Sequence, residues 1–284
     1  MKHLLLSLAL ALVACGDPGV DTPPADDGDD GGLQPRPDAG AEPEAQPEAT
    51  PEVQPEPEAT PEATPEPEVP VDPLDGLRDQ ALRDALNAMV SGHRVYNYGQ
   101  ARDFMYGIRA AIDVIDGQIE CVYTGRKTPP DQTRTPGGFN TEHSWPRSEG
   151  ADIEPELSDL HHLFPTTEEA NQERASLPFG ETSCAGSACP WDDGGSEMGA
   201  QSGRGDVFQV RALRQGDIAR AHFYFAIRYN RRIDAAEETT LRQWHAQDPP
   251  DDRERARNDA IERFQNNRNP FVDRPDLVDL ISDL

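Results

Sequence analysis

The chain has 284 residues, of which 53 are acidic and 26 are basic, and its formal net charge at pH 7 is −27. The acidity is uneven, because residues 1–73 contain 17 of the acidic residues and two of the basic ones. Residues 74–284, about 210 in number, are less acidic and are numerous enough to enclose one substantial core. The composition therefore predicts one folded domain, with or without insertions, and excludes a second core before it.

The N-terminus is typical of a targeting segment. Lys2 is followed by the apolar stretch LLLSLALALVA and then by Cys15. This stretch is too short to span a bilayer, which takes about 20 residues, and its pattern indicates a secretory signal. The letters LVAC also resemble a bacterial lipoprotein cleavage site, in which Cys15 would be acylated and would anchor the protein to a membrane. The alternative is a plain secretory signal that contains a cysteine by chance.

Residues 16–73 are expected to form a disordered spacer. The segment PEAQPEATPEVQPEPEATPEATPEPEVP repeats Pro-Glu-Ala/Thr and contains almost no large apolar side chains. Proline removes a backbone donor and favours extended geometry in the preceding residue, and like charges extend the chain further. An acidic docking tail is the alternative interpretation.

Three further cysteines follow in the domain. An exported protein meets an oxidising environment, in which disulfides persist. The stretch CAGSAC places Cys184 and Cys189 where they could close a small loop, which would leave Cys121 unpaired. An odd number of cysteines leaves the pairing open. The sequence contains no second Cys pair, so a zinc ribbon is not predicted.

Apolar residues at helical spacing predict two helices early in the domain. The first covers LDGLRDQALRDALNAMV (74–90) and the second covers YGQARDFMYGIRAAI (98–112). The stretch GQIECVYTG alternates and predicts a strand that ends at a glycine. A polar loop, RKTPPDQTRTPGG, follows it.

A strand and a helix are predicted in the middle of the domain. The stretch DLHHLFP predicts a short strand. Thr166 and Glu169 fit a capping box for a helix that runs through Asn171 to about Ala175.

The last third of the domain is predicted to be mostly helical. Residues 181–205 are glycine-rich and are predicted to be irregular. Helices are predicted over 217–230, with Asp217 as its cap, and over 251–265, which the letters NNRNP end. The predicted fold class is α+β, mainly helical with few short strands.

One constellation of polar residues indicates chemistry. Glu142 and His143 are adjacent in TEHSWPRSEG (141–150), and Asn171 lies on the helix predicted after the strand. Carboxylate and amide oxygens suit Mg²⁺, which keeps several waters, and an imidazole can take a proton from an attacking water. This combination fits metal-assisted phosphodiester hydrolysis. Spacing alone leaves structural roles for these residues equally open.

Several ordered motifs resemble the bacterial endonuclease I family of extracellular and periplasmic nucleases. They are NTEHSWPRS, DLHHLFPT, NQER and PFG, followed by QGDIARAHFYFAIRY (215–229) and QNNRNPFVDRPDL (265–277). The resemblance covers about 74–284. It implies a His-Me finger, a strand–strand–helix unit that holds a metal, and assigns His143 as the general base and Glu142 and Asn171 as the metal ligands.

Other residues near these motifs have open roles. His161 and His162 could bind zinc, although support of the metal site or packing is favoured because adjacent strand residues face opposite sides. Arg174 lies one helical turn after Asn171 and could hold the scissile phosphate or form a surface ion pair. Arg220 and Arg228 could contact a nucleic-acid backbone or simply be solvated.

The family resemblance implies an exported, metal-dependent endonuclease with little sequence preference that leaves 5′-phosphate products. DNA is the expected substrate and RNA a second candidate; Mg²⁺ is the expected ion, with Mn²⁺ or Ca²⁺ as alternatives. We expect a monomer that the lipid on Cys15 anchors to the cell envelope, at the outer membrane or cell surface, unless it is released. A noncatalytic DNA-capture lipoprotein and a phosphodiesterase for smaller substrates are the rival hypotheses. The acidity of the domain is unfavourable for nonspecific DNA binding, which rests on phosphate contacts.

Overall fold

The computed structural model describes residues 72–131 and 133–284, which belong to one compact unit. Cys15 and nearly all of the expected spacer lie outside the described residues. The helices are α1 (Asp79–Val90), α2 (Tyr98–Met105), α3 (Glu168–Arg174), α4 (Gln215–Arg228), α5 (Ala235–Gln247), α6 (Asp252–Gln265) and α7 (Pro270–Asp273). None of the described helices has the length and apolar character that crossing a membrane requires.

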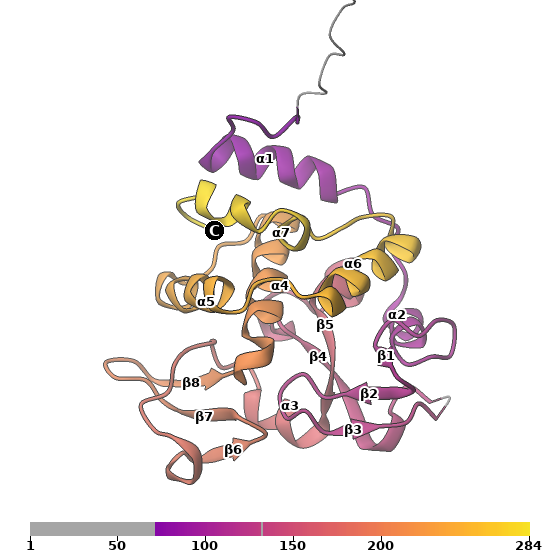
Figure 1. The fold of residues 1–284 in the computed structure, drawn as a ribbon, viewed down its shortest axis with the longest axis vertical. Helices are drawn as coiled ribbons and strands as arrows, with labels where there is room; N and C mark the ends of the chain where they lie inside the picture. The colour runs from indigo at the N-terminus through magenta and orange to yellow at the C-terminus, as the bar shows by residue number, and fades with distance from the viewer. Residues whose placement is uncertain (1–71, 132) are drawn as a thin grey trace, which may run out of the picture. The chain divides into compact units, whose positions relative to one another are not determined.

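Three small antiparallel sheets accompany the helices, so the α+β prediction is confirmed (Figure 1). The first sheet is β1 (Val114–Ile115), β2 (Gln118–Glu120) and β3 (Lys127–Thr128), and the second is the hairpin of β4 (Phe139–His143) and β5 (Leu163–Thr167). The third is β6 (Trp191–Asp193), β7 (Ser196–Ala200) and β8 (Asp206–Gln209).

Helix α4 is the centre of the core. All of its residues except Arg228 are buried, and it contacts α1, α5, α7 and the turn before β5. Figure 1 shows α5 and α6 on either side of it. A helix that is buried all round must be covered on every side by other elements. Helix α4 therefore fixes the position of β5 relative to the C-terminal helices.

Four predicted helix boundaries or caps were wrong. The first helix begins at Asp79 and not at Leu74. Helix α2 ends at Met105 rather than at 112, because Gly107 has φ +90° and breaks the helical path. Helix α3 is capped by Thr167, whose side chain accepts from the Ala170 amide, and not by Thr166. Asp217 is not a cap either, since α4 begins two residues before it.

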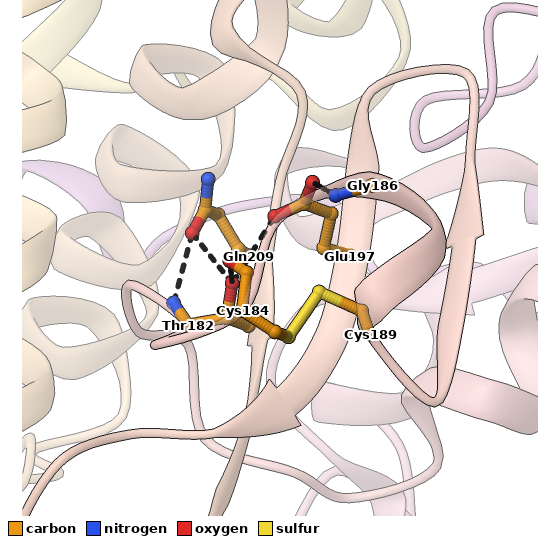
Figure 2. The surroundings of a disulfide bond; sticks show 6 residues. All are labelled: Thr182, Cys184, Gly186, Cys189, Glu197 and Gln209. Carbon is orange, nitrogen blue, oxygen red and sulfur yellow. Dashed lines mark hydrogen bonds between the residues drawn. A yellow bond between two sulfur atoms is a disulfide. The ribbon is translucent and has the colours of Figure 1, made fainter.

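The segment 181–205, predicted to be irregular, contains β6 and β7, and β8 completes their sheet. A disulfide joins Cys184 and Cys189 beside it (Figure 2). The Glu197 carboxylate accepts from the Gly186 amide at 2.6 Å, which attaches the disulfide loop to β7. Cys121 is free and buried. Glycine-rich strands lack the apolar alternation that sequence patterns depend on.

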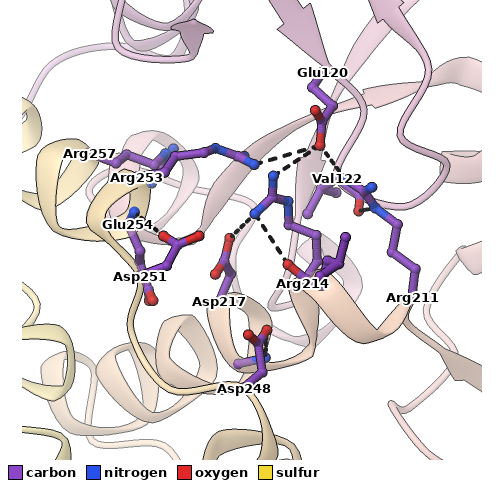
Figure 3. A network of polar contacts seen from close by, with 12 residues as sticks. Glu120, Val122, Arg211, Arg214, Asp217, Asp248, Asp251, Arg253, Glu254 and Arg257 are labelled. Atoms are coloured by element: carbon purple, nitrogen blue, oxygen red, sulfur yellow. Dashed lines mark hydrogen bonds and ion pairs between the residues drawn. The ribbon is translucent and has the colours of Figure 1, made fainter.

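A network of charged residues joins β2, the start of α4 and α6 (Figure 3). Arg214 Nη2 lies 2.9 Å from Glu120 Oε1, and Arg220 Nε lies 2.7 Å from Glu254 Oε1. Arg220 is fully buried, so neither solvation nor contact with a nucleic-acid backbone is open to it, contrary to the two alternatives expected. Arg228 donates to His93 Nδ1 at 3.1 Å. These arginines therefore hold elements together.

Candidate active site

The hairpin of β4 and β5 and the helix α3 form one continuous unit. Glu142 pairs with Phe164 and His143 with Leu163 in the antiparallel register. Helix α3 begins at Glu168, directly after β5 ends, because the Thr167 side chain caps its first turn. The order strand–strand–helix is the one that the family resemblance implied, and the residue pattern predicted its second strand and its helix. It places the end of β4 beside α3.

A cleft of about 310 Å³ opens where this unit meets α2. Glu142, His143 and Asn171 all line it, so the fold brings together the three residues that the sequence selected. The remaining lining residues are Tyr98, Asn140, Thr141, Pro146, Arg147, Ser148, Arg174, Ala175 and Ser176. The lining is mostly polar, which suits a charged substrate better than an apolar one.

The His143 imidazole is oriented by the backbone. Its Nε2 lies 3.1 Å from the carbonyl oxygen of Leu157. A carbonyl oxygen only accepts, so Nε2 carries the hydrogen and Nδ1 is the acceptor of the neutral ring. Nδ1 has no partner among the described residues. Burial, and then the charge of His162, lower the pKa of His143 well below its usual value, so the imidazole is neutral at pH 7.

Glu142 is 1% exposed but is not isolated. Its Oε1 accepts from the Tyr123 hydroxyl at 2.8 Å and lies 3.5 Å from Arg174 Nη1. Burial raises the pKa of Glu142 to about 6, and Arg174 and the Tyr123 hydroxyl oppose that rise. Both contacts involve Oε1, which leaves Oε2 without a hydrogen-bond partner in the described part of the chain.

Asn171 is half-buried on α3, and its side-chain amide makes no hydrogen bond with any described residue. The cleft thus contains a carboxylate oxygen and an amide oxygen without protein donors. Such a pair of hard oxygens fits a hydrated Mg²⁺, which uses few protein ligands. Within residues 72–131 and 133–284, no three His, Cys, Asp or Glu side chains cluster as a metal site.

His161 and His162 lie in a 3-10 turn before β5 and not in the strand itself, so the expectation that placed them on opposite faces of a strand was wrong in its geometry. His161 Nε2 lies 3.3 Å from the carbonyl oxygen of Asn267, and His162 Nε2 lies 2.7 Å from that of Glu156. The His162 ring packs 5.4 Å from the His143 ring. Both side chains are buried and packed against their neighbours, and His162 contacts the His143 ring.

Arg174 is 1% exposed, so it forms a buried ion pair with Glu142 rather than the surface pair considered above. Its Nη2 donates to the Ser144 carbonyl oxygen at 2.7 Å, and its guanidinium lies 4.6 Å over the Phe179 ring. These contacts hold the Arg174 guanidinium next to the Glu142 carboxylate. A role in holding phosphate stays a prediction.

Three residues of the site were not predicted from the sequence. The Tyr123 hydroxyl donates a hydrogen bond to Glu142. The only sequence feature that pointed to Tyr123 was its position at the end of the alternating stretch GQIECVYTG. The Tyr98 ring lies 5.2 Å from the His143 ring. Arg147 is exposed in the cleft and makes no ion pair with a described residue, although it stands four residues after His143 in the quoted motif.

The fold and the cleft define an α+β protein with a strand–strand–helix centre that presents carboxylate, imidazole and amide groups. The model of the endonuclease I family matches residues 80–276. The chain belongs to the endonuclease I family, and it is therefore a nuclease, a hydrolase that acts on nucleic acids.

Known nucleases resemble large parts of the chain. The extracellular ribonuclease of Bacillus subtilis (strain 168) is 29% identical over 237 residues, which cover 73% of this chain and 76% of that protein. The extracellular ribonuclease of Bacillus amyloliquefaciens is also 29% identical, over 72% of this chain and 75% of its own length. An extracellular deoxyribonuclease of Aeromonas hydrophila is 31% identical over 116 residues, which cover 41% of this chain and 49% of that protein.

Proposed function

We propose that the cleft is the active centre of an exported, metal-dependent endonuclease in which His143 is the general base. The observation that carries this proposal is the state of the His143 ring. Its Nε2 is bonded to the Leu157 carbonyl oxygen, while Nδ1 is free in a cleft that also contains Glu142 and Asn171. A neutral imidazole in this arrangement can accept a proton near neutral pH.

Each residue then has a defined task in hydrolysis. His143 Nδ1 takes a proton from the water that attacks phosphorus. The water oxygen bonds to phosphorus while the bond between phosphorus and the 3′ oxygen breaks. The 3′ oxygen takes up a proton from solvent water, which leaves a 5′-phosphate and a 3′-hydroxyl. Arg147, exposed at the rim, contacts a phosphate oxygen of the strand.

Glu142 Oε2 and the Asn171 amide oxygen would hold the ion, for which Mg²⁺ is the first candidate and Mn²⁺ or Ca²⁺ are alternatives. When bound, the ion would polarise the phosphate and stabilise negative charge on the leaving oxygen. Tyr123 and Arg174 keep the Glu142 carboxylate in place through Oε1. Supporting contacts of this kind orient the groups that bind metals.

Nucleic acid is the substrate, and both DNA and RNA are candidates because the similar proteins include ribonucleases and a deoxyribonuclease. Digestion of plasmid DNA and of ribosomal RNA by the full chain tests the proposal. We expect cleavage with Mg²⁺, none after EDTA treatment, and recovery when Mg²⁺ is restored. Cleavage that survives EDTA, or that returns only with zinc, would contradict it.

Two rival functions give different outcomes in the same assay. A noncatalytic DNA-capture protein would shift the DNA without cutting it. A phosphodiesterase for smaller substrates would hydrolyse short diesters and leave plasmid intact. The presence of Glu142, His143 and Asn171 together in one cleft favours catalysis over capture, because capture alone requires neither a general base nor metal ligands.

We propose that the protein is exported, since the similar nucleases include extracellular and periplasmic ones. Within this proposal, lipid on Cys15 anchors the chain and the acidic stretch to residue 73 is a spacer before a domain at 74–284. The nuclease is taken to act as a monomer. The substitution Cys15→Ser should move the activity from the membrane fraction to the soluble fraction. Retention of the Cys15→Ser protein in membranes would exclude the lipid anchor.

A further inference from the structure

A second cavity, of about 320 Å³, adjoins the cleft and takes no part in the chemistry described above. The two share Pro146, Arg174 and Ser176 as common walls. A hydrogen bond of 2.7 Å between the Ser148 and Ser176 hydroxyls forms the rim between them. Because the cavities share a rim, a nucleic-acid strand with its scissile phosphate in the cleft would extend over the second cavity.

The walls of the second cavity combine apolar surface with unused polar atoms. Its apolar residues are Trp145, Pro146, Leu177, Pro178 and Ile233. Among its polar residues, His222 and Arg174 are each at most 2% exposed, and His222 Nδ1 and Arg174 Nε are buried without a hydrogen-bond partner in the described part of the chain. Buried donors and acceptors are rarely left unpaired, so these atoms point to a ligand.

The charges argue against a phosphate group as that ligand. Arg204 is paired with Asp234, Arg174 with Glu142, and Arg232 with Asp283. Two further carboxylates, Glu149 and Glu237, also line the cavity. An added phosphate would therefore meet arginines that are already neutralised, together with two extra negative charges.

A neutral, flat group with both donors and acceptors fits these walls better. Its faces would contact apolar side chains such as Leu177 and Ile233, and its edge would face Arg204, His222 and Glu237. Nucleobases have this character, and arginine and carboxylate groups pair with their edges. The volume also falls in the range of small-molecule sites, which begins at about 300 Å³.

We propose that this cavity is a subsite for an unpaired nucleobase of the substrate next to the scissile phosphate. The inference rests on the proposed function, because it takes the cleft to be the place of cleavage. A base can enter such a cavity only outside the duplex stack. The enzyme therefore cuts single-stranded or locally opened nucleic acid faster than intact duplex.

The test maps cleavage of a single-stranded oligonucleotide by the full chain with Mg²⁺, with and without one abasic residue. Contact between a base and a protein site commonly changes binding by roughly 5- to 100-fold. We expect one phosphodiester bond, at a fixed distance along the strand from the abasic residue, to be cut more slowly by that factor than the same bond in the strand without an abasic residue. An unchanged cleavage pattern would overturn the subsite.

The substitution Leu177→Trp fills the cavity and should remove the discrimination between normal and abasic strands. Leu213→Trp, at a residue that is 73% exposed, is the matched control and should retain it. If the Leu177→Trp variant fails to fold, the map with the native chain decides alone. Absence of any cleavage by the native chain would overturn the proposed function itself, whereas cleavage that is blind to the abasic residue would overturn only the subsite.

Discussion

The cleft and the cluster around Asp159 are both polar and largely buried, but they differ in how fully their groups are paired. Asp159 Oδ2 accepts from the hydroxyls of Tyr224 and Tyr229, both at 2.8 Å, and Oδ1 accepts from Gln265 Nε2 at 2.9 Å. In the cleft, by contrast, Asn171 and one nitrogen of His143 are without partners among the described residues. Paired buried groups stabilise a fold, whereas unpaired ones are kept where function needs them.

The largest effect should follow from His143→Ala. Removal of a general base commonly lowers the rate by about 10²–10⁴-fold. The protein should stay folded, because the His143 side chain makes one hydrogen bond, to the Leu157 carbonyl oxygen. Initial rates of plasmid cleavage measure it. His245→Ala, which removes a histidine outside the cleft, is the control. A loss of less than a few-fold would remove His143 from the mechanism.

The buried histidines next to Asp159 should instead affect the pH dependence of the protein's stability. Burial lowers the pKa of His161 and of His162 to about 4, with Asp159 opposing the fall. Between pH 4 and 6.5 the unfolded chain binds protons that the folded chain does not, so stability is full above about pH 6.5 and decreases as the pH falls toward 4. The loss is on the order of 3 kcal/mol for each histidine.

Urea unfolding between pH 7.5 and pH 4.5 measures this dependence. His161→Gln should flatten the curve, because the variant has one fewer buried group to protonate. A free energy of unfolding that stays constant across this range would show that the two histidines do not control acid stability.

The substitution Tyr123→Phe tests the difference between the cleft and the cluster around Asp159. Loss of a contact that orients a metal ligand typically reduces metal affinity or activity by about 10–100-fold, so higher Mg²⁺ should restore part of the rate. Tyr229→Phe removes a hydroxyl of the same kind from Asp159. That control should lower stability and leave the Mg²⁺ dependence unaltered. If the cleavage rate depended on Mg²⁺ concentration in the same way in both variants, the proposed difference between the two regions would be wrong.

The smallest effect is expected from Arg147→Ala. An exposed ion pair contributes about 0.2–1 kcal/mol, so KM should rise by no more than about fivefold. One lost phosphate contact should also lower the salt dependence of binding by about one power of the salt concentration. Arg263→Ala, exposed on α6, is the control. An unchanged salt slope would show that Arg147 does not contact the strand.

The family resemblance implied the strand–strand–helix unit, and the residue pattern predicted its second strand and its helix because that information is local. Glu142, His143 and Asn171 lie within one short stretch, and the strand pairing places them along one cleft. The α+β class and the helix ending before Asn266 were also predicted, and Asn266 has the left-handed φ of 62° that asparagine tolerates.

Other features depend on contacts between distant segments, which sequence patterns do not report. Arg174 was expected either to hold phosphate or to form a surface ion pair. Its burial depends on Ser144 and on Phe179, which lies under its guanidinium. The role of Tyr123 likewise requires β2 to lie beside the hairpin. Helix α5 was missed although Asp234 caps it, because its apolar residues are too sparse to show helical spacing.

The proposed mechanism requires the Glu142 and Asn171 oxygens in the cleft to bind a divalent ion. Calorimetric titration of Mg²⁺, or of Mn²⁺ followed by electron paramagnetic resonance, into EDTA-treated full-length protein measures that binding. We expect one site that Glu142→Gln and Asn171→Ala each weaken at least about tenfold, while Gln172→Ala, one residue along α3, leaves it unchanged. Equal affinity in all four proteins, or no binding by the parent, would show that these oxygens do not bind the ion.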